Sequence, residues 1–128
     1  MSKPDGRDTE PAPDPDLLAR LFDDRDRTAR RVAALSGDVA DIVERSAEAA
    51  RDDEHDPEGA TIAFERAQAT ALRDAAREHL ADIDAAIERV RLGAHRRCHD
   101  CGAPLPDERL QARPTAVRCV PCASAAGR

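Results

Sequence analysis

The sequence predicts an all-α dominated protein: a long antiparallel coiled-coil hairpin followed by a small cysteine-bearing C-terminal module. Aromatic residues make up 2% of the 128 residues and charged residues 36%, a composition that suits long helices paired along narrow seams. Two stretches carry apolar residues at alternating spacings of three and four, which is the pattern of a coiled coil. Four cysteines follow these stretches in two CxxC pairs.

The first helix is expected after a polar, Pro-rich segment. Residues 1–13 cannot bury enough apolar surface to order themselves, so we expect them to be disordered. Asp14 then provides an N-cap and Pro15 suits the first helical position. The helix that follows is expected to end at about residue 51, and its apolar seam is broken only at Arg25. The seam consists of Leu18, Leu21, Thr28, Val32, Leu35, Val39, Ile42, Ser46 and Ala49.

An acidic stretch, residues 52–58, separates this helix from the second one and is expected to form the tip of the hairpin. Asp56 and Pro57 repeat the signal of an N-cap followed by proline. A second seam then runs to Gly93, the expected helix end, through Ile62, Ala69, Leu72, Ala76, Leu80, Ile83, Ile87 and Val90.

The two helices are nearly equal in length, roughly 55 Å each at 1.5 Å per residue. Equal lengths and a short link predict that residues 14–93 fold back on themselves as an antiparallel pair. The alternative is that both helices pair with another chain. The short acidic link favours the intramolecular hairpin, and therefore a monomer.

The cysteine spacing predicts a metal site within residues 94–122. Each CxxC pair fits a tight turn that presents two thiolates to one ion, and the 17-residue segment between the pairs lets the turns face each other. Four thiolates favour tetrahedral zinc and leave no open coordination position. We therefore expect a four-cysteine zinc finger with one structural Zn²⁺ per chain, whose ligands are Cys98, Cys101, Cys119 and Cys122. Residues 123–128, after the last cysteine, are expected to form a flexible tail.

Other uses of the cysteines fit the sequence less well. A tetrathiolate iron site needs the same ligands, whereas a redox dithiol usually lies in a βαβ context that this sequence lacks. His99 lies between the first two cysteines and is a competing ligand, while His79 and His95 are expected on the surface. No histidine has a nucleophile partner, so we predict that the protein is not an enzyme and has no catalytic residues.

The charge distribution argues against a general nucleic-acid binder. The net charge is −6, although residues 93–128 hold six Arg against three acidic residues. No segment approaches the roughly 20 apolar residues of a membrane span, and the N-terminus has no apolar leader region. We therefore expect a cytoplasmic protein without a membrane partner.

Three segments of the module together resemble the zinc finger of the DksA/TraR family: residues 98–106, 108–116 and 119–122. The Arg-Leu-x-Ala-Arg-Pro segment from Arg109 to Pro114 makes this resemblance more specific than the cysteine spacing alone. The acidic link extends it to about residues 45–122, and the first helix agrees by position.

Members of the family regulate transcription by binding bacterial RNA polymerase, and they are not enzymes. Their hairpin enters the secondary channel, where acidic tip residues approach the catalytic centre and change the lifetime of promoter complexes. The resemblance implies this function and this partner for the present chain. It also implies candidate basic contacts at Arg109 and Arg113 and a partner-binding tip made of Asp52, Asp53, Glu54, Asp56 and Glu58.

The chain departs from the family pattern at the tip and after the last cysteine. The family tip reads Asp-Pro-x-Asp-x-Ala, whereas here Asp56 matches the first acid, Gly59 replaces the second and Thr61 replaces the alanine. Glu58 is the candidate substitute for the missing acid. The family pattern has a lysine directly after the last cysteine, whereas this chain has Ala123 there. We also expect no C-terminal helix, and these two departures argue against a response to guanosine tetraphosphate.

Two other functions are compatible with the sequence. A nucleic-acid-binding zinc module would use Arg96, Arg97, Arg109, Arg113 and Arg118, but a zinc tetrathiolate would offset much of their charge, and stacking aromatics are absent. A protein–protein adaptor without activity in the polymerase channel is the other alternative.

Overall fold

The computed structural model describes residues 14–52 and 57–127, with side chains described for residues 14–49 and 59–127. These residues form four helices: α1 (Pro15–Asp52), α2 (Pro57–Arg91), α3 (Asp107–Ala112) and α4 (Val120–Ala126). The described residues contain no strand, only an isolated bridge between Arg97 and Pro104. None of the described helices is long and apolar enough to cross a membrane. The predicted fold class, two long paired helices followed by a cysteine module, is confirmed.

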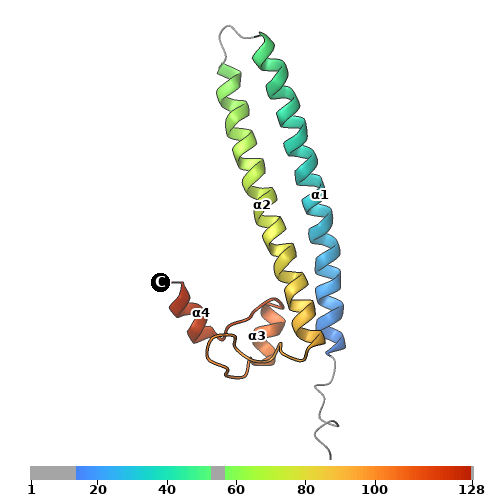
Figure 1. Cartoon of the computed structure of the whole chain (residues 1–128), viewed down its shortest axis with the longest axis vertical. Helices are drawn as coiled ribbons and strands as arrows, with labels where there is room; N and C mark the ends of the chain where they lie inside the picture. The colour runs from blue at the N-terminus through green and yellow to red at the C-terminus, as the bar shows by residue number, and fades with distance from the viewer. Residues whose placement is uncertain (1–13, 53–56, 128) are drawn as a thin grey trace, which may run out of the picture. The chain divides into compact units, whose positions relative to one another are not determined.

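The chain divides into two compact units, and α1 and α2 contribute to both. The first unit contains residues 14–25 and 81–127, and the second contains residues 26–80. Within each unit the α1 and α2 segments lie side by side and run in opposite directions (Figure 1). An ion pair links them in the first unit, between Arg25 and Asp84 at 2.5 Å, and another in the second, between Arg45 and Glu65 at 3.0 Å.

The start of α1 is capped as the sequence predicts. The Asp14 carboxylate accepts a hydrogen bond from the backbone N–H of Leu17 at 3.2 Å, and the Asp14 carbonyl accepts one from Leu18 at 2.9 Å. The same carboxylate forms an ion pair with the Arg96 guanidinium at 2.8 Å. Asp14 therefore both begins α1 and ties that helix to the segment after α2.

The predicted seams match the buried faces of the two helices. All nine seam positions of α1 are buried or half-buried, with Leu21 fully buried. Arg25, where the apolar pattern breaks, is instead held by its ion pair with Asp84. On α2 every seam position is buried or half-buried except Leu72, which is 43% exposed.

The end of α2 depends on a glycine and a basic side chain. Gly93 adopts a positive φ of 73°, and Ala94 N–H bonds to the Arg89 carbonyl at 2.8 Å, which satisfies a carbonyl left over at the helix end. The Arg89 guanidinium in turn donates to the carbonyls of Ala94 and Arg97, at 3.1 Å each. Gly93 thus ends the helix region as predicted, two residues after the last α2 residue.

The core of the first unit joins both long helices to the cysteine module. It contains aliphatic side chains from each part, together with one cysteine: Leu17, Leu21, Ile83, Ala86, Ile87, Val90, Cys98, Leu105 and Leu110. Leu110 comes from α3, a short helix that the sequence did not predict. Because α3 supplies a core residue, the module is packed against the long helices as well as being held by its own loops.

The expectation of a flexible tail without a C-terminal helix is wrong. Residues 120–126 form α4, which begins after Cys119 and carries Pro121 in its first turn. Proline is tolerated in the first turn, where a backbone N–H would have no partner within the helix, and the alanines that follow are the strongest helix formers. The predicted disordered lead, residues 1–13, lies outside the described residues.

The fully buried Leu21 provides a test of the core of the first unit. Leu21→Ala should lower the free energy of unfolding by about 2–5 kcal/mol, because it removes buried methyl groups and leaves a cavity. Leu92→Ala is the matched control, since Leu92 is 71% exposed and its loss should cost less than about 0.5 kcal/mol. Urea unfolding followed by circular dichroism measures both, and equal losses would contradict this core.

Candidate metal centre

Two turns bring the cysteines together, and each arises from local chain chemistry. In the first, Gly102 N–H bonds to the Cys98 carbonyl at 3.0 Å, and Gly102 adopts a positive φ of 75° that glycine tolerates best. Cys98 N–H bonds to the Ala103 carbonyl at 2.7 Å, which closes the loop. In the second, Cys119 is the N-cap of α4 and Cys122 lies in the first turn of that helix.

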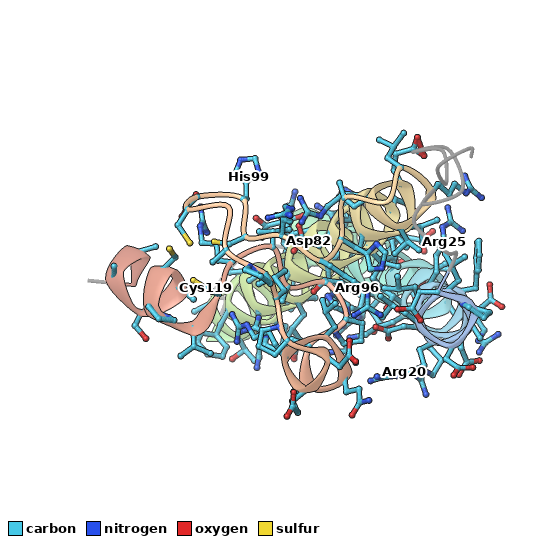
Figure 2. The ribbon with its side chains drawn as sticks, turned by 90° about the horizontal axis from the view of Figure 1, so that it is seen from below. Arg20, Arg25, Asp82, Arg96, His99 and Cys119 are labelled. Carbon is cyan, nitrogen blue, oxygen red and sulfur yellow. The ribbon has the colours of Figure 1, made fainter. Side chains whose placement is uncertain are left out.

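The sulfur atoms have a geometry that suits one tetrahedral ion. All four lie within 4.8 Å of one another, and the Cys101 and Cys119 sulfurs are 3.8 Å apart. A tetrahedral zinc with Zn–S bonds of about 2.3 Å separates its sulfurs by about 3.8 Å. Figure 2 shows the sulfur atoms gathered around Cys119. The structure thus brings together the four cysteines that the sequence selects, and they fit a zinc ion.

The thiols influence one another's ionisation strongly. Backbone N–H groups, first that of Cys101 and then that of Cys119, donate to the Cys98 sulfur and lower its pKa to about 6. Hydrogen bonds with the thiols of Cys119, Cys101 and Cys98 raise the pKa of Cys122 to about 12. Crowded thiols hold protons between them because adjacent negative charges repel, and a divalent cation removes that repulsion. The donor set is therefore suited to a cation that replaces these protons.

His99 is not part of the cluster, although it lies between two of its cysteines. The cluster of metal-binding side chains in the described residues contains four cysteines and no histidine. Figure 2 shows the imidazole of His99 pointing away from the sulfur atoms. Its backbone has a structural role, because His99 N–H bonds to the Val117 carbonyl at 2.7 Å and joins the two turns.

Charged side chains reinforce the connection between the two turns. Arg118, just before the second cysteine pair, forms an ion pair with Asp100 at 2.7 Å. Arg109 on α3 donates to the Arg118 carbonyl at 3.0 Å. These contacts hold the turns in register alongside the thiol cluster.

His95 is buried, contrary to the prediction that it lies on the surface. The residue is 4% exposed, and neither ring nitrogen has a hydrogen-bond partner among the described residues. Its Nε2 lies 3.7 Å from the Asp14 carboxylate. Burial, followed by the charge of Arg96, lowers the pKa of His95 despite the opposing effect of Asp14. His79, by contrast, is exposed as predicted.

The two candidate basic contacts lie in the same hollow. Arg109 and Arg113 line a depression of about 320 Å³ together with Arg118 and Asp82. Arg113 is exposed, whereas Arg109 is half-buried and held by its bond to the Arg118 carbonyl. Ala123, at the position where the family pattern has lysine, lines the same hollow with only a methyl group.

The predicted tip lies outside the residues whose side chains the structure describes. This applies to all five candidate carboxylates, namely Asp52, Asp53, Glu54, Asp56 and Glu58. The assignment of these residues therefore stays a prediction.

The fold and the thiol cluster define a helical-hairpin protein with a structural metal centre of four cysteines. Residues 92–126 match the family described as prokaryotic dksA/traR C4-type zinc finger. This match confirms the predicted resemblance of the cysteine module to that zinc finger, and the four clustered cysteines provide one structural zinc site per chain.

Two individual proteins are also similar to this chain. The structure of transcription factor DksA2 from Pseudomonas aeruginosa superposes with a TM-score of 0.75, covering 98% of this chain and 91% of that one at 24% identity. The uncharacterized protein YteA of Bacillus subtilis (strain 168) is 38% identical over 65 residues, which is 51% of this chain. The matched region covers 27% of the length of YteA.

Replacing one thiol tests the metal centre. Cys101→Ser should abolish the one zinc ion per chain and lower the thermal unfolding midpoint, because structural zinc contributes on the order of 10 kcal/mol to small modules. His99→Ala is the control and should keep full zinc content. Metal analysis by atomic absorption measures both variants, and zinc loss from His99→Ala would contradict a shell of four cysteines.

The burial of His95 predicts a pH dependence of stability. Because the folded protein disfavours the charged imidazole, the unfolded chain takes up the proton first as the pH falls below about 6.5, and stability is lost there. His95→Leu should therefore lose less stability than the wild type between pH 7 and 5.5. Arg89, Arg96 and Asp14 are unchanged in both proteins, so urea unfolding across this range isolates the effect of His95.

Proposed function

We propose that this protein is a cytoplasmic, monomeric transcription regulator that binds bacterial RNA polymerase and inserts its hairpin tip into the secondary channel. The proposal is supported chiefly by the similarity to a transcription factor, DksA2, that extends over 98% of this chain. The zinc finger of the dksA/traR family points in the same direction. In this proposal residues 14–93 form the inserted hairpin, and residues 94–122 form the finger that binds outside the channel.

The metal has a structural role in this proposal, and its ligands are Cys98, Cys101, Cys119 and Cys122. When bound, zinc neutralises the thiolates and joins the two turns. A shell of four thiolates leaves no position for substrate, so the protein acts by binding and not by catalysis. The fixed module presents Arg109 and Arg113, whose positive charges suit an acidic surface of the partner.

The carboxylates of residues 52–58 are the part that acts on the polymerase. Carboxylate oxygens bind Mg²⁺ and pair with basic side chains, and both are suitable targets in a channel that leads to a nucleotide-polymerising centre. A helical arm of roughly 55 Å supplies the reach. Because Gly59 replaces the second acid of the family tip, Glu58 carries that role in this chain.

Neutralising the tip separates binding from activity. The combined variant Asp53→Asn, Glu54→Gln, Asp56→Asn and Glu58→Gln should bind polymerase as the wild type does but lose its effect on promoter-complex lifetime. Asn at position 56 keeps the ability to cap a helix, so helicity should be unchanged. Lifetimes measured by competitor challenge test this, and an unaltered effect on transcription would contradict the assignment of the tip.

The binding site on the polymerase is tested with a known secondary-channel factor as competitor. The zinc-loaded protein should be displaced from polymerase by that factor, because both would occupy one channel. Absence of binding at tens of micromolar would refute the proposed function, whereas binding without displacement would place the protein elsewhere on the polymerase.

A further inference from the structure

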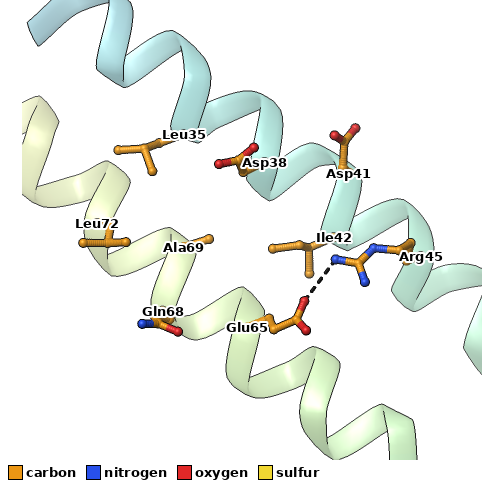
Figure 3. Close-up of a pocket in the computed structure, with 9 residues that line it drawn as sticks. All are labelled: Leu35, Asp38, Asp41, Ile42, Arg45, Glu65, Gln68, Ala69 and Leu72. Atoms are coloured by element: carbon orange, nitrogen blue, oxygen red, sulfur yellow. Dashed lines mark hydrogen bonds and ion pairs between the residues drawn. The ribbon is translucent and has the colours of Figure 1, made fainter.

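The second unit contains an open groove between α1 and α2 with a volume of about 420 Å³ (Figure 3). Its apolar floor is formed by Leu35 and Ile42 from α1 and by Ala69 and Leu72 from α2. All four are positions of the predicted seams. The groove therefore lies along the helix–helix contact, at a place where the side chains do not fill the space between α1 and α2.

Small side-chain volume at one position keeps the groove open. Ala69 is the α2 seam residue within the floor, and a methyl group does not fill the space opposite Leu35 and Ile42. Leu72, which lines the same floor, is 43% exposed although the other predicted seam residues of α2 are buried or half-buried. Water contacts apolar surface here that a larger side chain would cover.

Apolar exposure continues along the α2 side of the groove. Phe64, Gln68 and Leu72 follow one another at intervals of four residues, which places them along one side of the helix. Phe64 is 70% exposed, and it is one of only two phenylalanines in the chain. Exposed apolar residues that adjoin an apolar groove are typical of a protein-binding surface.

The α1 wall of the groove carries negative charge that no described residue neutralises. Asp38 and Asp41 both line it, and neither forms a hydrogen bond or ion pair with any residue that the structure describes. Glu65, on the opposite wall, is already paired with Arg45 at 3.0 Å, as the dashed line in Figure 3 shows. The charge left over along this groove is therefore that of the two aspartates.

We propose that this groove binds a basic segment of the RNA polymerase, so that the arm contributes a contact separate from the tip. An aliphatic side chain of that segment occupies the floor between Ile42 and Leu72, and flanking Lys or Arg residues pair with Asp38 and Asp41. The inference rests on the proposed function and adds a second contact surface to it. A second copy of this chain is a poorer occupant, because its net charge of −6 would bring more negative charge to an acidic wall.

Two groove variants of the full, zinc-loaded chain test the proposal. Asp38→Asn with Asp41→Asn should weaken binding to purified RNA polymerase about tenfold and reduce its dependence on salt, because two ion pairs are lost. Ala69→Leu keeps every charge but fills the floor, so it should also weaken binding while leaving the unfolding midpoint unchanged or higher. Biolayer interferometry at several salt concentrations measures the affinities.

A matched control removes the same charge from elsewhere on α1. Asp26→Asn with Glu44→Gln changes two exposed acids that do not line the groove, and its affinity should stay within twofold of wild type. Equal weakening in this control would show a net-charge effect and overturn the proposal. Circular dichroism and zinc content verify that each variant is folded.

The outcomes distinguish this inference from the proposed function. Wild-type affinity in both groove variants, with polymerase binding intact, would overturn the groove contact and leave the proposed function standing. Normal binding by Ala69→Leu alone would overturn the insertion of an aliphatic side chain. If the wild-type protein itself does not bind polymerase, both the function and the groove contact are refuted.

Discussion

The clustering of four thiols around one metal position is the constraint on which residues 94–127 depend. The buried residues of that segment are few, namely His95, Cys98, Leu105 and Leu110. Three of them belong to the core shared with α1 and α2, and zinc binding by the four thiols would add free energy that offsets the entropy of ordering the loops. Cys98 belongs both to the thiol cluster and to the hydrophobic core that includes Leu21 and Ile83.

The second unit depends on a much thinner contact. Its buried residues include two isoleucines, Ile42 and Ile62, while Thr28 and Ala76 fill other seam positions with small side chains. A seam built in this way lets the helices run side by side without filling all the space between them. The groove over Ala69 is the result, and it leaves apolar surface and two aspartates available to a partner.

Much of the fold and of the metal centre could be predicted because the signals are local. Asp14 and Gly93 act on the backbone within a few residues of themselves, and CxxC spacing specifies a turn that contains both ligands. The tail was mispredicted for a related reason. Pro121 in the first turn of α4 and the alanines after it are also a local signal for helix, and this signal lies partly within the cysteine motif itself.

The sequence by itself therefore determined the two long helices, their seams and the four thiols, because periodicity, caps and ligand spacing act over a few residues. Only the tertiary structure decided that His95 is buried beside Asp14 and that Leu110 joins the core. It also decided that the seam opens at Ala69 and leaves Leu72 exposed. These features depend on which side chains face one another across distant parts of the chain, and on whether their volumes and charges match.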